Sequence, residues 1–369
     1  MGSGPGVARQ REPETSEDPA GDLNPGIDAT VLPFPPTVAR TRRVAVLHEL
    51  TTQYPAWMLL GLAASMLNMA LANLGTPRWD LAWPTVFPLG LFCGFYALRA
   101  RQAVGPGYRR SLLTGAVGAA FALIGAVCVF HPPTPLGRTD LLRVYELSNF
   151  IGFVPLVVFG WTHGHGTRWV FFGGALLYGM LLENGGIALG YFAELAYRLY
   201  IPGLVAPIAT MLGWVMVMYM CTFLTWQARA AWPKLQSSPL ASGALVAAAG
   251  LAFDLQVDPI ATASGCWVWD SRLPPFFLGV PLINFVAWIA ALWPFGTVLF
   301  AVQARHGLTD GGAWPARAVR DLVLAVPLAL TAASLLFLGA MAVVEGGTDG
   351  PTFVILGEFL LKVEGLLLA

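Results

Sequence analysis

The sequence predicts an all-α integral membrane protein, a polytopic bundle of about nine or ten transmembrane helices. Hydrophobic residues make up 56% of the chain and charged residues only 11%, whereas an ordinary soluble domain carries about 25% charged residues. The apolar residues are also gathered in long runs with short polar segments between them. A water-soluble fold of this composition would need an implausibly large core, so we expect a membrane protein.

The chain divides into two parts. Residues 1–45 are rich in Pro, Gly and acidic residues and lack apolar periodicity, which predicts a disordered cytoplasmic tail. The tail has no apolar stretch after a basic start, as a signal peptide would have. Residues 46–369 form the predicted transmembrane helical domain.

Ten apolar runs in this domain are candidate helices, because a spanning helix needs about 20 residues, with a range of roughly 17 to 25. They are residues 55–74, 82–98, 111–130, 146–161, 169–190, 201–224, 240–254, 276–301, 318–345 and 353–368. The fourth and seventh runs are short, and the tenth is long enough for an interfacial helix. The expected number of spanning helices is therefore nine or ten.

The distribution of charge predicts an orientation. Most Lys and Arg residues fall in the segments on the same side as the tail, so the N-terminus is expected in the cytoplasm. Most acids of the helical domain fall near the opposite, outer face. The net charge is zero and no basic patch alternates with aromatic residues, so we expect no nucleic-acid partner. The expected location is a plasma membrane of the bacterial or archaeal type.

Two aspartates stand out at the end of the seventh run. Asp254 and Asp258 are four residues apart, so a helix places both on one face, and Pro259 is expected to end or kink that helix. Two carboxyl groups this close repel, so one is expected to stay protonated, an arrangement that general acid–base chemistry uses. The alternative is a solvated helix end at the outer surface.

Glu183 lies inside the fifth apolar run. A glutamate there must face the interior of the bundle and find a partner, and the glycines that follow it (Gly185, Gly186 and Gly190) allow a backbone or a flat apolar ligand to come close. The alternative is a structural hydrogen bond to a neighbouring helix. Glu194 is expected in the outer loop, where a solvated loop acid is the simpler interpretation.

Aromatic and amide side chains accompany the aspartates. Trp267 and Trp269 precede Asp270, and Asn284 and Trp288 follow in the eighth run. The tryptophans either form an interfacial belt or surround a cationic intermediate, which a desolvated aromatic face stabilises by roughly 0.5 to 2 kcal/mol. Asn284 is expected to bind water or an acid, or to join two helices.

Two segments share a short sequence pattern, which we call the echo. Residues 207–214 (PIATMLGW) and 281–288 (PLINFVAW) share a proline, six residues and a tryptophan. This pattern predicts that helices five and six form a parallel repeat of helices seven and eight. The alternative is that proline and tryptophan are simply common in membrane helices.

We expect no metal and no cofactor. His163 and His165 lie in a short loop far from the acids, which favours solvated side chains over metal ligands. The cysteines show no C-x-x-C spacing. The chain also lacks the glycine-rich dinucleotide motif, the P-loop and the G-x-S-x-G elbow.

Taken together, these residues resemble the carotenoid-biosynthesis membrane proteins typified by the CruF-like hydratases of γ-carotene and bisanhydrobacterioruberin. The resemblance covers about residues 140–300. Its features are Glu183 with the glycines after it, Glu194, the Pro207–Trp214 helix, the DLQVDP segment of Asp254 to Pro259, Trp267-Val268-Trp269, Gly279-Val280-Pro281, Asn284-Phe285 and Trp288. Ala287 departs from the pattern, which has a glycine before the last tryptophan.

The resemblance implies hydration of the terminal C1–C2 double bond of an acyclic carotenoid end, without a cofactor. The expected substrates are the carotenoid, which arrives from the lipid, and water; other enzymes of the carotenoid pathway are candidate partners. The predicted catalytic residues are Asp254, Asp258 and Glu183. The predicted substrate-binding residues are Trp267, Trp269, Asn284, Trp288, Glu194 and Asp270.

Two other functions stay open. Asp254-x-x-x-Asp258 resembles one of the two aspartate-rich motifs with which membrane prenyltransferases hold Mg²⁺ and pyrophosphate, although the second motif is absent and few basic residues lie on the same face. Acids within a helical bundle also mark ion pathways. A transporter or a non-catalytic carotenoid-binding protein is therefore the second alternative.

Overall fold

We describe the protein from a computed structural model. It describes residues 174–194, 199–309 and 314–368, together with short pieces at 58, 62, 66, 78–81, 146, 147, 149, 150, 152–154, 156 and 157. All of these residues belong to the compact unit Arg40–Ala369. The predicted tail, most of the first four apolar runs and the two histidines of the 163–165 loop lie outside the described residues.

The described part of the chain is mostly helical, as predicted. Its helices are α6 (Leu176–Leu189), α7 (Ile208–Ala231), α8 (Pro239–Ser264), α9 (Leu282–Arg305), α10 (Ala316–Val344) and α11 (Pro351–Leu368), with a 3-10 turn at Pro233–Leu235. Four short strands occur between them, namely β1 (Phe192–Glu194), β2 (Trp267–Trp269), β3 (Pro275–Phe277) and β4 (Val280–Pro281).

Four of the described helices, α7 to α10, are long and apolar enough to cross a membrane. This finding supports the predicted class of membrane protein. The total of nine or ten spanning helices and the orientation of the bundle stay predictions, because the earlier runs lie outside the described residues.

Prolines set where two of the helices begin. Pro207 and Pro281 have extended backbones, with ψ of 152° and 153°, directly before α7 and α9. A proline tolerates the start of a helix because its missing N–H has no intrahelical partner there. The apolar residues before each proline belong to loops and to β3 and β4, so both helices begin later than the apolar runs predicted.

Pro259 does not end α8, contrary to one of our expectations. The helix continues to Ser264, five residues beyond it. Asp258, Pro259, Ile260 and Ala261 are all buried. Packing of these side chains on the neighbouring helices outweighs the single backbone hydrogen bond that a proline removes.

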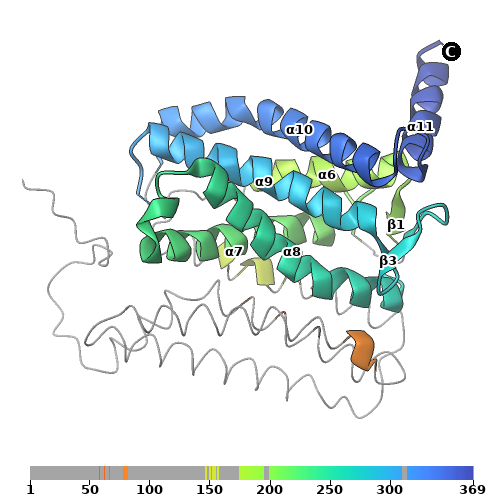
Figure 1. The fold of residues 1–369 in the computed structure, drawn as a ribbon, viewed down its shortest axis with the longest axis horizontal. Coiled ribbons are helices and arrows are strands. Elements are labelled where there is room, and N and C mark those ends of the chain that lie inside the picture. Colours follow the sequence, from red (N-terminus) through yellow and green to blue (C-terminus); the bar gives the residue numbers. More distant parts are fainter. Residues whose placement is uncertain are drawn as a thin grey trace, which may run out of the picture. The chain divides into compact units, whose positions relative to one another are not determined.

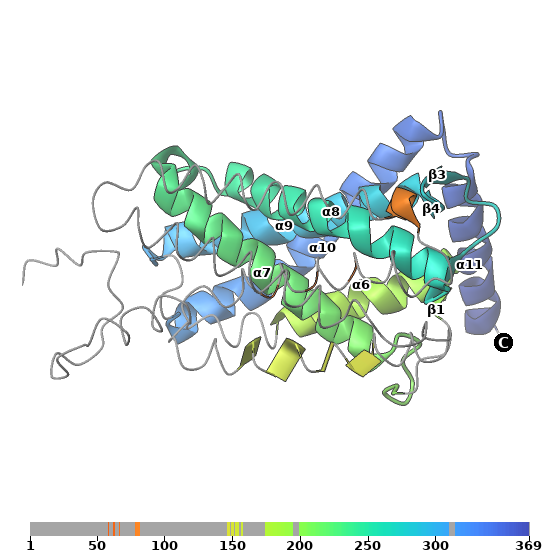
Figure 2. The same cartoon turned by 90° about the horizontal axis from the view of Figure 1, so that it is seen from below.

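Helix α9 contacts both α8 and α10, and α7 contacts α8 (Figure 1). The approach of α8 to α9 depends on Gly243, where a Cβ atom would lie 2.5 Å from the backbone nitrogen of Thr297 and 2.7 Å from the carbonyl oxygen of Trp293. Small residues at such crossings let membrane helices pack backbone to backbone. The strands and α11 lie together at one end of these helices (Figures 1 and 2).

Helices α6 and α8 end in the same way. Each ends at a glycine in the left-handed conformation, Gly190 with φ 89° and Gly265 with φ 71°. The residue after each glycine donates its backbone N–H to the carbonyl oxygen five residues earlier. These hydrogen bonds are Tyr191 to Gly186 at 3.1 Å and Cys266 to Ala261 at 2.8 Å. A three-residue strand then begins. The two helix ends are therefore built on one pattern, the glycine-terminated C-cap.

The strands that follow join these two ends symmetrically. β1 and β2 pair antiparallel. Ala193 lies opposite Val268 at the centre, Phe192 lies opposite Trp269, and Glu194 lies opposite Trp267. Ala193 and Val268 occupy the same place in the two segments, so the pairing has local two-fold symmetry. This symmetry supports the predicted repeat of α6 and α7 by α8 and α9.

Candidate active site

A cavity of about 210 Å³ is lined by residues of α6, α7, α8 and α9 and of the strands β1 and β2. Six of the predicted catalytic and substrate-binding residues line it: Glu183, Asp258, Trp267, Trp269, Asn284 and Trp288. These residues lie up to 105 positions apart in the sequence. The other residues that line the cavity are largely apolar. The cavity is therefore where the predicted polar residues meet.

The two aspartates of α8 are buried rather than solvated. Asp254 is fully buried and Asp258 is 4% exposed, so the alternative of a solvated helix end does not hold. Asp258 lines the cavity, whereas Asp254 lies behind it. The two aspartates are one helical turn apart on α8, so their buried carboxyl groups share one face of the helix.

Asn284 holds Asp254 in place by hydrogen bonds. Its Nδ2 lies 3.1 Å and 3.0 Å from the two carboxyl oxygens of Asp254 and donates to them. Asn284 and Trp288, both on α9, also line the cavity together with Asp258. One amide thus joins α8 to α9 and satisfies an acid that has no access to water, as buried polar groups require.

Glu183 reaches the same cavity from α6. Its side chain is 8% exposed, and its Oε2 accepts a hydrogen bond of 2.6 Å from the indole Nε1 of Trp214 on α7. The predicted partner on a neighbouring helix is thus an indole N–H. Because Glu183 also lines the cavity, this bond orients a carboxyl group that a ligand can contact.

The glycines around Glu183 have separate roles. A Cβ atom on Gly186 would lie 2.6 Å from the ring of Phe192, so this glycine permits the close approach of a side chain, where a backbone or a flat ligand was predicted. Gly185 and Gly190 have nothing within 4 Å of such an atom. Gly190 is needed instead for its positive φ of 89°.

Aromatic rings form much of the wall. Trp214 and Trp288 stack with their ring centroids 4.7 Å apart, and Phe192 lies against Trp269 at 5.2 Å. Trp269 is held by a 3.0 Å hydrogen bond from its Nε1 to the hydroxyl of Thr262. These rings give the cavity flat faces with few free polar groups.

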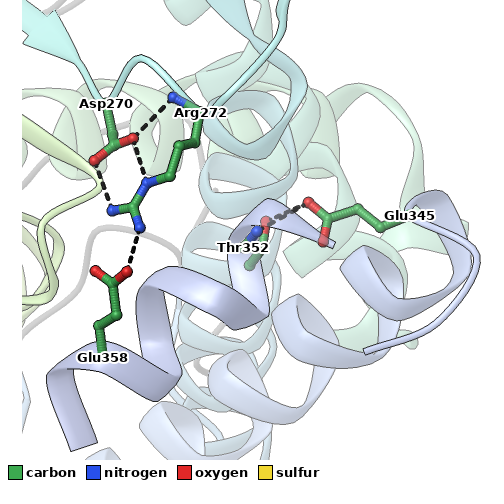
Figure 3. Close-up of polar contacts among 5 residues, drawn as sticks. All are labelled: Asp270, Arg272, Glu345, Thr352 and Glu358. Atoms are coloured by element: carbon green, nitrogen blue, oxygen red, sulfur yellow. Dashed lines mark hydrogen bonds and ion pairs between the residues drawn. The ribbon is translucent and has the colours of Figure 1, made fainter. Parts of the chain in front are cut away.

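Asp270 and Glu194 differ from the other predicted residues. Asp270 does not line the cavity; it lies in the loop after β2 and forms an ion pair of 2.9 Å with Arg272, which also binds Glu358 of α11 at 2.7 Å (Figure 3). Hydrogen bonds from Arg272 lower the pKa of Asp270 to about 2. Glu194 pairs through its backbone with Trp267, while its side chain lies outside the described residues.

Many of the lining residues had no assigned role in the sequence analysis, among them three aromatic residues. Tyr191 and Phe192 follow α6, and Trp214 was used only for the short echo. The echo itself was the signal for Trp214, because it placed this residue in the position that corresponds to Trp288. Nothing in the spacing pointed to Tyr191 or Phe192, which reach the cavity through the pairing of β1 with β2.

Asn184 supports the site from outside the cavity lining. Its Oδ1 accepts hydrogen bonds from the backbone nitrogens of Val205 and Ala206 at 2.8 Å and 2.9 Å. Its Nδ2 donates to the carbonyl of Met180 at 2.8 Å. Asn184 therefore attaches the segment before α7 to α6, next to Glu183.

The acids do not form an evident metal site. Among the residues that the structure describes, no group of three or more His, Cys, Asp or Glu side chains is placed to hold a metal ion. What the cavity offers instead is two carboxyl groups from different helices, Asp258 and Glu183, among aromatic rings. Such a site can donate a proton, accept one and stabilise a positive charge between them.

Comparison with models of known protein families matches residues 145–358 to the family described as carotenoid biosynthesis protein. The matched region includes every lining residue of the cavity except Leu62 and Met66, and it extends beyond residue 300, where our sequence resemblance ended. No curated protein matches the chain. No solved structure matches it either.

Proposed function

Because this chain belongs to the carotenoid biosynthesis protein family, we propose that it is a hydratase that adds water to the terminal C1–C2 double bond of an acyclic carotenoid end. The observation that carries the proposal is the meeting of Asp258 and Glu183 at one aromatic cavity. Hydration of an alkene needs an acid, a base, a shielded cation and one water molecule, and it needs no redox cofactor.

The size of the cavity supports an end group as the reacting part. A dry cavity of about 150 Å³ accommodates benzene, and a water molecule takes up about 30 Å³ of liquid volume. At about 210 Å³, the cavity has room for one branched end of a polyene and a water molecule. The rest of the polyene lies outside it, in contact with the apolar helices or the lipid.

In the proposed first step, the carboxylic acid of Asp258 donates a proton to C2. The electron pair of the double bond forms the new C–H bond, and C1 becomes a tertiary carbocation. Asp258 is the proposed donor because it lines the cavity, whereas Asp254 is behind it. Asn284, which lines the same cavity, is the proposed hydrogen-bond donor to the carboxylate that Asp258 becomes.

In the second step, a water oxygen bonds to C1 and the water loses a proton to Glu183. The product is a tertiary alcohol, and the atoms of one water molecule have been added. Glu183 leaves the step protonated and Asp258 ionised, so a proton returns from Glu183 to Asp258 before the next turnover. The rings of Trp214 and Trp288 line the cavity in which the cation forms, and a desolvated indole face stabilises such a charge by roughly 0.5 to 2 kcal/mol.

Single amide substitutions test this assignment. Cells that make an acyclic carotenoid and lack other hydratases should form the 1-hydroxy product with the wild-type chain. Asp258→Asn and Glu183→Gln should lower product formation at least a hundredfold, the usual contribution of a general acid or base. Asp270→Asn, outside the cavity, is the matched control and should keep wild-type activity.

The other outcomes identify the alternatives. Full activity of Asp258→Asn would overturn the proton-donor assignment. A product that carries a prenyl group, formed only with Mg²⁺, would identify a prenyltransferase. Purification with an unconverted polyene would identify a carotenoid-binding protein.

A further inference from the structure

The two repeats place equivalent residues on the cavity. Glu183 lies seven residues before Gly190 and Asp258 lies seven residues before Gly265, so the two acids have the same position relative to the ends of α6 and α8. In the next helix of each repeat, a tryptophan lies seven residues after the proline that precedes the helix. Glu183 accepts a hydrogen bond from Trp214 of its own repeat, and Asp258 lines the cavity together with Trp288 of its own repeat.

The two tryptophans also meet at the centre of this arrangement. Their rings stack at 4.7 Å with an angle of 28° between the planes. Residues that are equivalent in two repeats come into direct contact where the local two-fold axis passes between them. The stack of Trp214 on Trp288 and the pairing of Ala193 with Val268 are two such contacts.

We infer that Trp214 is a positioning residue of this site: its N–H orients the Glu183 carboxyl group, and its ring couples that group to Trp288 and Asp258 of the other repeat. The inference rests on the role proposed above for Glu183. A bond of 2.6 Å from an indole N–H to a carboxylate is short for an N–H donor. It fixes one oxygen of a carboxyl group that also lines the cavity.

The backbone beside Trp214 shows that its place is built into the fold. A Cβ atom on Gly179 would lie 2.5 Å from Cβ and 3.0 Å from Cγ of Trp214. Only glycine at 179 therefore lets the indole lie against α6. The corresponding position in the other repeat is Asp254. In the first repeat the indole ring of Trp214 lies against this position, whereas in the second repeat the position carries a carboxyl group.

A double-mutant cycle tests the inference. Trp214→Phe keeps an aromatic face and removes the N–H, so kcat should fall about tenfold or more, as expected when a charged group loses a hydrogen bond, while KM stays within about twofold. The double variant Trp214→Phe/Glu183→Gln should be no slower than Glu183→Gln alone, because the two residues act as a unit. Trp293→Phe is the control; it removes an indole N–H that binds the carbonyl of Leu240 outside the cavity.

A spectroscopic measurement tests the hydrogen bond between Trp214 and Glu183 without an activity assay. The difference between the ultraviolet resonance Raman spectra of wild type and Trp214→Phe isolates the signal of Trp214. This signal should be that of a strongly hydrogen-bonded indole N–H, and Glu183→Gln should shift it toward a weaker hydrogen bond. If Trp214→Phe does not fold, the comparison of wild type with Glu183→Gln alone gives the same information.

Two results separate this inference from the proposed function. If Glu183→Gln lowers activity but Trp214→Phe multiplies the loss further, Trp214 has only a packing role and the inference is overturned. If Glu183→Gln keeps full activity, the proposed function fails at Glu183. The Raman result then still shows whether Trp214 binds its carboxyl group.

Discussion

The indole rings of Trp214 and Trp288 stack on each other with their centroids 4.7 Å apart. They come from α7 and α9; Trp214 donates a hydrogen bond to Glu183, and Trp288 lines the cavity together with Asp258. This contact joins the two repeats of the chain at the cavity. It therefore links the internal symmetry of the fold to the proposed chemistry.

The stack gives an optical prediction. Two indoles at this distance and angle couple electronically and should produce a paired positive and negative band in the circular dichroism spectrum. Trp214→Phe and Trp288→Phe should each remove the pair of bands, because either change leaves one ring without its partner. Trp293→Phe should keep it. A pair of bands that survives both cavity substitutions would contradict the stacking.

The bond between Asn284 and Asp254 predicts a loss of stability. Asn284→Ala leaves a fully buried carboxyl group without its amide donor, which should cost about 1–3 kcal/mol of the free energy of unfolding. Thermal and denaturant unfolding in detergent measures the change. Asp254→Asn, which still offers a carbonyl oxygen to Asn284, should be less destabilising. Equal stability of Asn284→Ala and wild type would show that the bond contributes nothing.

Two glycine substitutions should have opposite effects. Gly243→Ala puts a methyl group against the backbone of α9 and should destabilise the protein by about 1–3 kcal/mol, since overpacking forces helices apart. Gly357→Ala in α11 meets nothing within 4 Å and should be neutral or stabilising by up to about 1 kcal/mol, because alanine favours a helix. Unfolding midpoints in one detergent compare the two. Equal midpoints would refute the close α8–α9 contact.

The ion pairs around Asp270 predict a dependence on pH. Arg272 lowers the pKa of Asp270 from its ordinary 3.8 to about 2. The folded state therefore binds a proton less readily than the unfolded state, so the stabilisation is complete above about pH 4 and is lost as the pH falls to about 2. The difference in melting temperature between wild type and Asp270→Asn should shrink over this interval. A difference that is unchanged at pH 2 would mean that another interaction is responsible.

Local sequence patterns were enough to predict part of the site. The spacing of Asp254 and Asp258 placed both on one face of a helix, since residues four apart always share a face. The apolar surroundings of Glu183 predicted a buried side chain with a partner, which the structure supplies as Trp214. These predictions used only neighbours along the chain and the cost of a charge in an apolar environment.

The rest depended on contacts between distant segments. The seventh apolar run stopped at residue 254 and the helix was expected to end or kink at Pro259, whereas α8 continues to Ser264 with Asp258 to Ala261 buried. The three-residue strands β1 and β2 are too short to show an alternating pattern. Their pairing brings Phe192 and Trp269 together from positions that no local rule relates.

The central claim is that Asp258 protonates a carotenoid end group and that water supplies the new hydroxyl. The direct test incubates membranes containing the wild-type chain with an acyclic carotenoid in H₂¹⁸O, without oxygen gas, followed by mass spectrometry of the pigment. The account predicts a 1-hydroxy product that carries ¹⁸O from water in the wild type and is absent from Asp258→Asn. Unlabelled hydroxyl, no water addition by the wild type, or full labelled product from Asp258→Asn would contradict it.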